Sequence, residues 1–239
     1  MPTTFRTHFN DDITRTENLL ARSRAMQDAG EPERLYQDIR LSSVALAVGA
    51  LDAYLCDAYV DCLTAVLRAY TQGQWVGALP SAYSKQLLPA GEILKSTRQH
   101  RPLWRVRMAA RKVMEKDNML SLSRLEDHFN GILPNNQKLW LDFVSVLAAH
   151  NCVRLTRHVA ADLAALAGDA LVQAKKQVVS AVKARLTSTI QIRHDWIHNC
   201  GRPKNAIYDL THGQARARIR DIRLFIEDLD NHLDSHRVV

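Results

Sequence analysis

The sequence has little cysteine, glycine, proline or aromatic content. Its four cysteines, Cys56, Cys62, Cys152 and Cys200, are scattered over 239 residues, and no two form a Cys-x-x-Cys pair. We therefore expect reduced thiols, and neither a disulfide framework nor a zinc ribbon. Nine glycines, seven prolines and the shortage of evident strand segments favour an all-α fold.

Several functional signatures are also missing. We find no glycine-rich phosphate loop, no serine nucleophile elbow and no dinucleotide-binding fingerprint. The first residues, MPTTFRTHFNDD, contain no apolar core of a signal peptide. The most apolar segment is interrupted by Asp52, Asp57 and Asp61, which argues against a membrane span. We expect a cytoplasmic protein that uses no cofactor.

The bulk composition is that of a folded chain. Hydrophobic residues make up 46% and charged residues 24%, and the length is sufficient for a substantial core. We predict one domain over residues 1–239, a helical bundle around a long central helix. The net charge of +7 and the pI of about 9.4 suit an anionic partner such as nucleic acid, although an excess of this size is common.

The positive charge is concentrated in one segment. Residues 85–124 hold ten Lys or Arg and three Asp or Glu, an excess equal to that of the whole chain. We interpret this segment as part of a basic helical insertion over residues 71–135. A basic helix with an aromatic residue, Trp104, suits phosphate contacts, and a solvated helix face is an equally good explanation. The RNA-binding residues predicted here are Arg101, Arg105, Arg107, Arg111 and Lys112.

The long central helix is predicted over about residues 33–70, and Val44–Leu51 is apolar all round, as in a core helix. Ala45, Gly49 and Ala53 form a small-residue ridge that would let another helix approach closely. Asp52 lies on or beside that ridge, where a carboxylate requires a partner. Arg193 is one candidate, and another basic residue or solvent is the alternative.

Other helices are predicted at both ends of the chain and between. Asp209 or Thr211 could cap the final helix. The apolar residues of this final helix are in near-ideal helical register: Ala215, Ile219, Ile222, Ile226, Leu229 and Leu233. The remaining predicted spans are about 5–29, 122–133, a helix after Pro134, 153–166, and 171–197 as one helix or two.

The most informative stretch reads IQIRHDWIHNCGRP, from Ile190 to Pro203. Gly201 can adopt the left-handed conformation of a helix cap, and Pro203 cannot continue a helix. The helix should therefore end just before Gly201. We expect His198, Asn199 and Cys200 in its last turn, beside a cationic loop containing Arg202 and Lys204. The spacing also predicts that one face of this helix carries Leu186, Ile190, Arg193 and Ile197. Arg193 is the one charged residue on this otherwise apolar face.

The separation of Arg193 and His198 by four residues resembles the motif of the HEPN superfamily, all-helical domains of which many are metal-independent ribonucleases. In that motif a polar residue, often Asn, usually follows the Arg; here it is His194, which is a departure. The segment LSSVALAVGALDAYLCDAYVDCL also resembles the second helix of the RiboL-PSP-HEPN subgroup. The resemblance covers the two ends of the chain and leaves the middle unassigned.

The resemblance implies a metal-independent endoribonuclease that acts as a homodimer on RNA. Histidine suits proton transfer near neutral pH, and the arginine fork suits phosphate oxygens. The family's biology would be stress response, toxin–antitoxin pairs or phage defence, with an antitoxin or regulatory protein as a further partner. The implied catalytic residues are Arg193, His198, His194 and Asp195, with Asp52 and Asn199 supporting and Arg202 and Lys204 contacting RNA.

Two alternatives remain open from the sequence. His194 and His198 have the i, i+4 spacing of a zinc site, but no third ligand is evident, and Asp195 is shorter than the glutamate that a zinc protease would use; we therefore predict no metal. A catalytically inactive RNA-binding or dimerisation module is the second alternative, because His194 departs from the family pattern.

Overall fold

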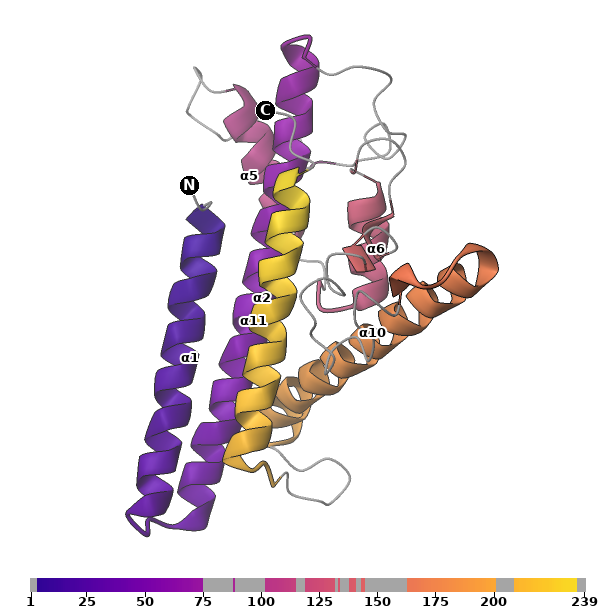
Figure 1. Cartoon of the computed structure of the whole chain (residues 1–239). Helices are drawn as coiled ribbons and strands as arrows, with labels where there is room; N and C mark the ends of the chain where they lie inside the picture. Colours follow the sequence, from indigo (N-terminus) through magenta and orange to yellow (C-terminus); the bar gives the residue numbers. More distant parts are fainter. Residues whose placement is uncertain are drawn as a thin grey trace.

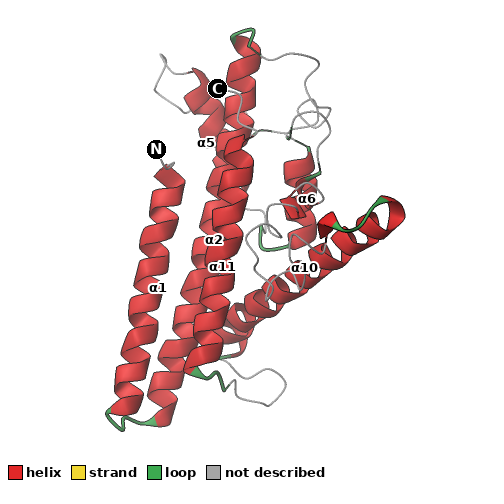
Figure 2. Cartoon of the chain, in the orientation of Figure 1, coloured by secondary structure: helices red, strands yellow, loops and turns green. Residues whose placement is uncertain are grey.

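In the computed structural model every described element is a helix, as the sequence predicts (Figures 1 and 2). The structure describes residues 4–74, 88, 102–114, 119–131, 133, 138–140, 143–144, 163–200 and 209–235. The predicted helices at 153–162 and most of the segment after Pro134 lie outside these residues. The helices are α1 (Thr4–Asp28), α2 (Glu33–Thr71), α5 (Pro102–Met114), α6 (Leu122–Asn130), α10 (Gly168–Asn199) and α11 (His212–Ser235).

Helices α1, α2 and α11 lie side by side and form the long core of the molecule (Figure 1). The Tyr54 side chain of α2 joins all three. Phe5 and Phe9 of α1 meet its ring edge-on at 5.3 and 5.6 Å between centroids, and its hydroxyl donates a 2.6 Å hydrogen bond to Asp230 of α11. Burial and this hydrogen bond raise the pKa of Tyr54 far above its usual range. Tyr54 therefore stays a neutral donor.

The spans predicted for α1, α2, α6 and α10 agree with the structure to within a few residues. Helices α1 and α2 both end in glycine-based caps, where Gly30 and Gly73 have positive φ and the next N–H bonds back to Met26 and Ala69. Pro32 lies immediately before the first residue of α2. The segment 168–199 is one continuous helix.

Helix α2 is the core helix that the sequence predicts. By length and composition it is also the single described helix that could cross a membrane, a test that core helices of soluble proteins pass as well. Val44–Leu51 has no exposed residue, and α2 packs against α1, α5, α10 and α11. Two of its carboxylates, Asp57 and Asp61, form ion pairs with α5. These contacts are those of a helix buried within the protein.

Helix α11 confirms the prediction from its apolar register, because all six predicted residues are buried. Thr211 provides the predicted cap. Its Oγ1 accepts from the N–H of Gln214 at 3.2 Å, and the Gln214 side chain accepts from the Thr211 N–H at 2.8 Å. This reciprocal pair is a capping box. Asp209, the other candidate cap, accepts a 2.6 Å hydrogen bond from Gln37 of α2 instead.

Candidate active site at the end of helix α10

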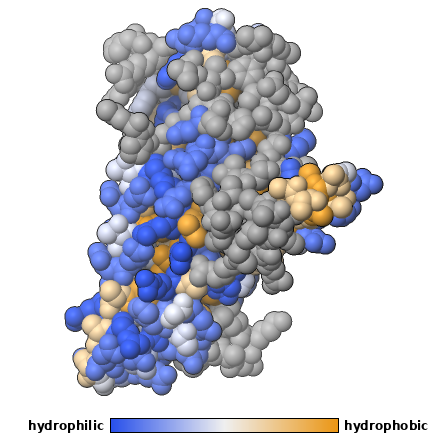
Figure 3. Space-filling view, viewed as in Figure 1, coloured by the Kyte–Doolittle hydropathy of each residue, from blue (hydrophilic) through white to orange (hydrophobic). Residues whose placement is uncertain are grey.

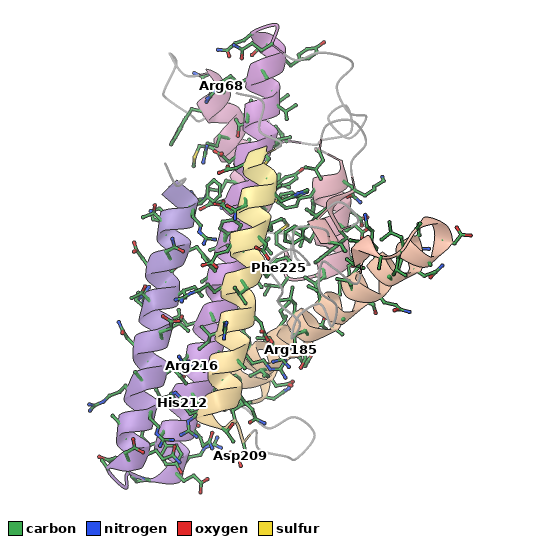
Figure 4. All side chains as sticks on the ribbon, in the orientation of Figure 1. Arg68, Arg185, Asp209, His212, Arg216 and Phe225 are labelled. Carbon is green, nitrogen blue, oxygen red and sulfur yellow. The ribbon has the colours of Figure 1, made fainter. Side chains whose placement is uncertain are left out.

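The carboxyl-terminal half of α10 is anchored on α2 and α11. Arg185 forms a 2.6 Å ion pair with Asp221 of α11, whose side chain is completely buried. Arg218 of α11 donates to the hydroxyl of Thr189 at 3.2 Å and to the carbonyl of Arg185 at 3.4 Å. Figure 4 shows Arg185 where α10 passes beside α11. These contacts set the orientation of the residues that follow on α10.

The buried stripe of α10 differs from the predicted one. Ile197, predicted inward, is 51% exposed, and Arg193 is half-buried. The prediction was wrong because the stripe changes from steps of four residues to steps of three after Leu186. Each such change rotates the buried face around the helix. The buried residues are Ala174, Val178, Val182, Leu186, Thr189, Ile192 and Asp195.

Arg193 lies at the edge of the contact between α10 and α2, close enough to Asp52 for their charges to interact. Burial raises the pKa of the Asp52 carboxyl, and the positive charge of Arg193 partly opposes that rise. The buried Oδ1 of Asp52 has no hydrogen-bond partner, and among the described residues no ion pair or hydrogen bond reaches the Arg193 guanidinium. The predicted partners are therefore electrostatic neighbours, and none of the described residues occupies the donors of the guanidinium.

The small-residue ridge of α2 does not receive a closely packed helix among the described residues. A Cβ added to Gly49 would meet no atom within 4 Å, and Ala53 is exposed. The ridge permits close approach, and the described helices do not use it at Gly49 and Ala53. Asp52, beside the ridge, is half-buried.

The two histidines of the motif lie together on the outer face of α10. His194 and His198 are both exposed, and their ring centroids are 4.6 Å apart with the ring planes tilted by 47°. No hydrogen bond or ion pair joins either ring to Arg193 within the described part of the chain. On an ideal helix, Arg193 and His198 point about 140° apart. One protomer therefore presents an imidazole pair on one face and a guanidinium on another.

The last turn of α10 is held by Asp195. This residue is 5% exposed, and its Oδ1 accepts hydrogen bonds from Gln191 at 3.0 Å and from Asn199 at 3.2 Å. Helix α10 ends at Asn199 as expected, but Cys200 takes the left-handed conformation that we predicted for Gly201, with φ of 48°. The Cys200 N–H bonds back to the carbonyl of Asp195. Asp195 and Asn199 thus stabilise the turn that carries His198.

A shallow hollow of about 770 Å³ runs along the same outer face of α10 and stops one turn before His194. Hydroxyl, amide and ammonium groups supply most of its polar lining, and none of the described lining residues is acidic. One of them, Lys183, forms a 2.7 Å ion pair with Glu126 of α6. The described lining consists of Lys176, Val179, Ser180, Lys183, Ala184, Thr187, Ser188 and Gln191.

The predicted RNA-binding arginines of α5 lie elsewhere. Helix α5 packs against the carboxyl-terminal part of α2, at the opposite end of the molecule from the end of α10 (Figure 1). Arg107 and Arg111 form ion pairs with Asp61 and Asp57 of α2 at 2.6 and 3.5 Å. Arg105 is half-buried, and Lys112 is exposed. Arg101, Arg202 and Lys204 lie outside the described residues.

Metal-ligand clusters are absent from the described residues, where no three His, Cys, Asp or Glu side chains gather. His212, near the motif in sequence, lies instead at the start of α11 among arginines (Figure 4). Burial, together with the charges of Arg40, Arg24 and Arg216, lowers the pKa of its imidazole. A three-ligand catalytic zinc site is not formed by this part of the chain.

The sequence prediction missed the residues that orient α10. Arg218 and Asp221 directly precede Ile219 and Ile222, two residues of the predicted buried face of α11. A carboxylate beside a buried position was the one signal in the sequence that Asp221 would need a basic partner. Its partner could not be inferred, because Arg185 is 36 residues away in the chain.

Comparisons with known proteins do not assign the chain to a family. No protein-family model matches it, and neither the curated proteins nor the solved structures give a match.

Proposed function

We propose that the protein is a metal-independent endoribonuclease, as the resemblance of its Arg193–His198 motif to the HEPN superfamily implies. The observation that carries the proposal is the exposed imidazole pair, His194 and His198, held at the anchored end of α10. Two imidazoles on one face can act as base and acid in a single reaction, because their ordinary pKa lies near neutral pH. RNA supplies its own nucleophile, the 2′-hydroxyl, so the chemistry requires no metal.

In this proposal one imidazole takes the 2′-hydroxyl proton while the 2′-oxygen bonds to phosphorus. The other imidazole donates its proton to the 5′-oxygen as the phosphorus–oxygen bond to that oxygen breaks. The products are a 2′,3′-cyclic phosphate and a free 5′-hydroxyl. His198 occupies the position of the family's histidine, and His194 is the second proton carrier.

Arg193 stabilises the additional negative charge on the phosphate oxygens in the transition state. Its guanidinium has the donors for this role, since none is used by an ion pair or hydrogen bond within the described residues. Because Arg193 and His198 point in different directions on α10, we propose a homodimer in which the motifs of two protomers face each other. The exposed Ile197 between them supplies apolar surface for that contact.

RNA would approach along the hollow of α10, whose described lining offers ammonium, hydroxyl and amide donors without a carboxylate. Arg202 and Lys204 follow the motif in sequence and would add phosphate contacts. We place the activity in the cytoplasm, as a toxin or phage-defence effector controlled by an antitoxin or regulatory protein; this part rests on the resemblance alone.

A second candidate is an inactive module that binds RNA or dimerises. The observation that favours it is that no hydrogen bond joins Arg193 and His198 within one protomer. The two candidates differ in whether RNA that is bound is also cleaved.

The deciding experiment incubates the purified protein with a mixed RNA pool in excess EDTA. We expect cleavage that leaves cyclic-phosphate ends, and a loss of at least about 100-fold in the His198→Ala variant. His8→Ala, an exposed histidine on α1, is the matched control and should cleave as the wild type does. RNA binding without cleavage by the wild type would favour the inactive module.

A further inference from the structure

The geometry of the imidazole pair points to a second property of the same face. His194 and His198 are one helical turn apart, exposed, and close enough for both rings to approach one point in solvent. Neither ring is engaged by a hydrogen bond or ion pair within the described residues. An exposed pair at this spacing is a chelating unit, since the helix backbone holds both ligands in place before any ion arrives.

The distance between the rings matches that of two imidazoles on one metal ion. A bond of about 2.05 Å from nitrogen to zinc, with the ring centre about 1.2 Å behind the nitrogen, places each centre about 3.2 Å from the ion. At ligand angles between about 90° and 109°, the two centres are then about 4.5 to 5.3 Å apart. The observed separation is 4.6 Å, so the distance between the two ring centres already lies in this range.

The chemical class of the ion follows from the ligands. Imidazole nitrogen suits Zn²⁺, Ni²⁺ and Cu²⁺, whereas Mg²⁺ and Ca²⁺ prefer oxygen ligands. No third protein ligand belongs to the pair among the described residues, so water would complete the coordination. Asp195, the carboxylate next to His194 in the sequence, is buried, and its Oδ1 already accepts hydrogen bonds from Gln191 and Asn199.

We propose that His194 and His198 bind a divalent transition-metal ion, and that the bound ion inhibits the ribonuclease. The inhibitory half rests on the proposed function. An imidazole nitrogen that donates its lone pair to a metal can no longer accept a proton, so the base and acid of the reaction are lost together. Metal here acts opposite to its role in a zinc hydrolase, where removal of the ion abolishes activity.

The binding experiment uses the full chain without a histidine tag, after EDTA treatment and dialysis, and without RNA. Calorimetric titration with Zn²⁺, Ni²⁺ and Cu²⁺ should give one site per chain, with Cu²⁺ bound most tightly. His194→Ala and His198→Ala should each weaken this binding at least about tenfold. His8→Ala should leave it unchanged, and the ion should raise the midpoint of thermal unfolding in the wild type and in this control. Unchanged affinity in both motif variants would overturn the site.

The cleavage experiment adds the same ions at concentrations that fill the site. We expect cleavage to fall as the site fills, and EDTA to restore it. Stimulation of cleavage by the ion would overturn the inhibitory role. If no RNA is cleaved under any condition, the proposed function and its inhibition both fail, and the titration without RNA still decides the metal site.

Discussion

Three carboxylates of α2 lie near arginines of other helices, and they are found in two different states. Asp57 and Asp61 meet Arg111 and Arg107 of α5 in ion pairs of 3.5 and 2.6 Å. Asp52, little more than one turn earlier, has a buried Oδ1 without a hydrogen bond. The charge of Arg193 opposes the rise in the pKa of Asp52, yet no ion pair joins these two residues.

The comparison distinguishes arginines that serve helix packing, Arg107 and Arg111, from Arg193, which has no ion pair among the described residues. The α5 arginines neutralise carboxylates of the core helix, so part of the basic charge in residues 85–124 serves packing. This outcome favours a structural explanation for Arg107 and Arg111 over the RNA-contact explanation that the sequence left equally open. Arg193, which has no such partner among the described residues, retains the donors that a phosphate would need.

The largest effect that tests this comparison concerns cleavage. If the proposed ribonuclease is correct, Arg193→Ala should lower the cleavage rate at least about 100-fold, because a donor to the transition state is removed. Arg107→Ala, matched in chemistry, should change the rate less than about threefold, because that guanidinium is occupied by Asp61. Rates on one RNA under single-turnover conditions provide the measurement. Equal losses in the two variants would abolish the distinction between the two arginines.

A second prediction extends the comparison to the ion pair that orients α10. Arg185→Ala removes the 2.6 Å ion pair to the fully buried Asp221 and should lower the free energy of unfolding by about 3 kcal/mol. Arg15→Ala breaks an exposed pair with Asp12 and should cost less than about 1 kcal/mol. Urea unfolding at neutral pH measures both. A loss below 1 kcal/mol for Arg185→Ala would show that α10 is anchored mainly by its apolar stripe.

The smallest effect concerns the pH dependence of stability. The pKa of Asp52 in the folded chain is raised above its ordinary value of 3.8. As the pH rises, the Asp52 carboxyl therefore loses its proton in the unfolded chain before it does so in the folded chain. Asp52 therefore contributes stability at low pH that is lost as pH rises from about 3.8 through the folded pKa. Asp52→Asn should remove this loss, so the variant should gain stability relative to the wild type between pH 3 and pH 7.

Asp61→Asn is the control, and its expected change in stability has the opposite sign to that of Asp52→Asn. At neutral pH it loses the ion pair with Arg107 and should be less stable than the wild type by up to about 1 kcal/mol. Thermal unfolding midpoints of the two variants, measured across the same pH range, test both expectations. If Asp52→Asn behaves like Asp61→Asn, then Asp52 is paired as its neighbours are.

Surface hydropathy shows a further difference between the two ends of α10. Figure 3 shows apolar surface at its projecting amino-terminal end, where Leu166 and Val172 are 37% and 45% exposed. The carboxyl-terminal end carries the exposed histidines beside Ile197 instead. Among the described residues, the second end is therefore the one where apolar surface lies beside exposed imidazole side chains.

The predictions made from local pattern were the ones confirmed. The register of Ala215 through Leu233 predicts the buried face of α11, because six apolar residues at helical spacing leave one way to bury them. Thr211 is one of the two caps predicted for α11, and its hydrogen bond with Gln214 depends on neighbouring residues alone. The motif stretch likewise predicts the end of α10 within one residue of its observed position.

The predictions that required knowledge of a partner were less successful. The ridge at Ala45, Gly49 and Ala53 permits close packing, but whether a helix uses it depends on the other faces of α2. Ile197 fits the apolar periodicity and is nevertheless exposed, because the stripe of α10 turns where Thr189 meets Arg218 of α11. A long α-helix offers several compatible faces, and the sequence does not rank them.

The sequence by itself determined the all-helical class, the central helix α2, the buried face of α11 and the end of α10 at the motif, since each depends on spacing and capping within one segment. Only the tertiary structure decided that Arg107 and Arg111 form ion pairs with Asp61 and Asp57, that Arg193 lies near Asp52 without an ion pair between them, and that His194 and His198 share an exposed face. These outcomes depend on which helices meet and at what rotation, and those are set by packing between residues far apart in the chain.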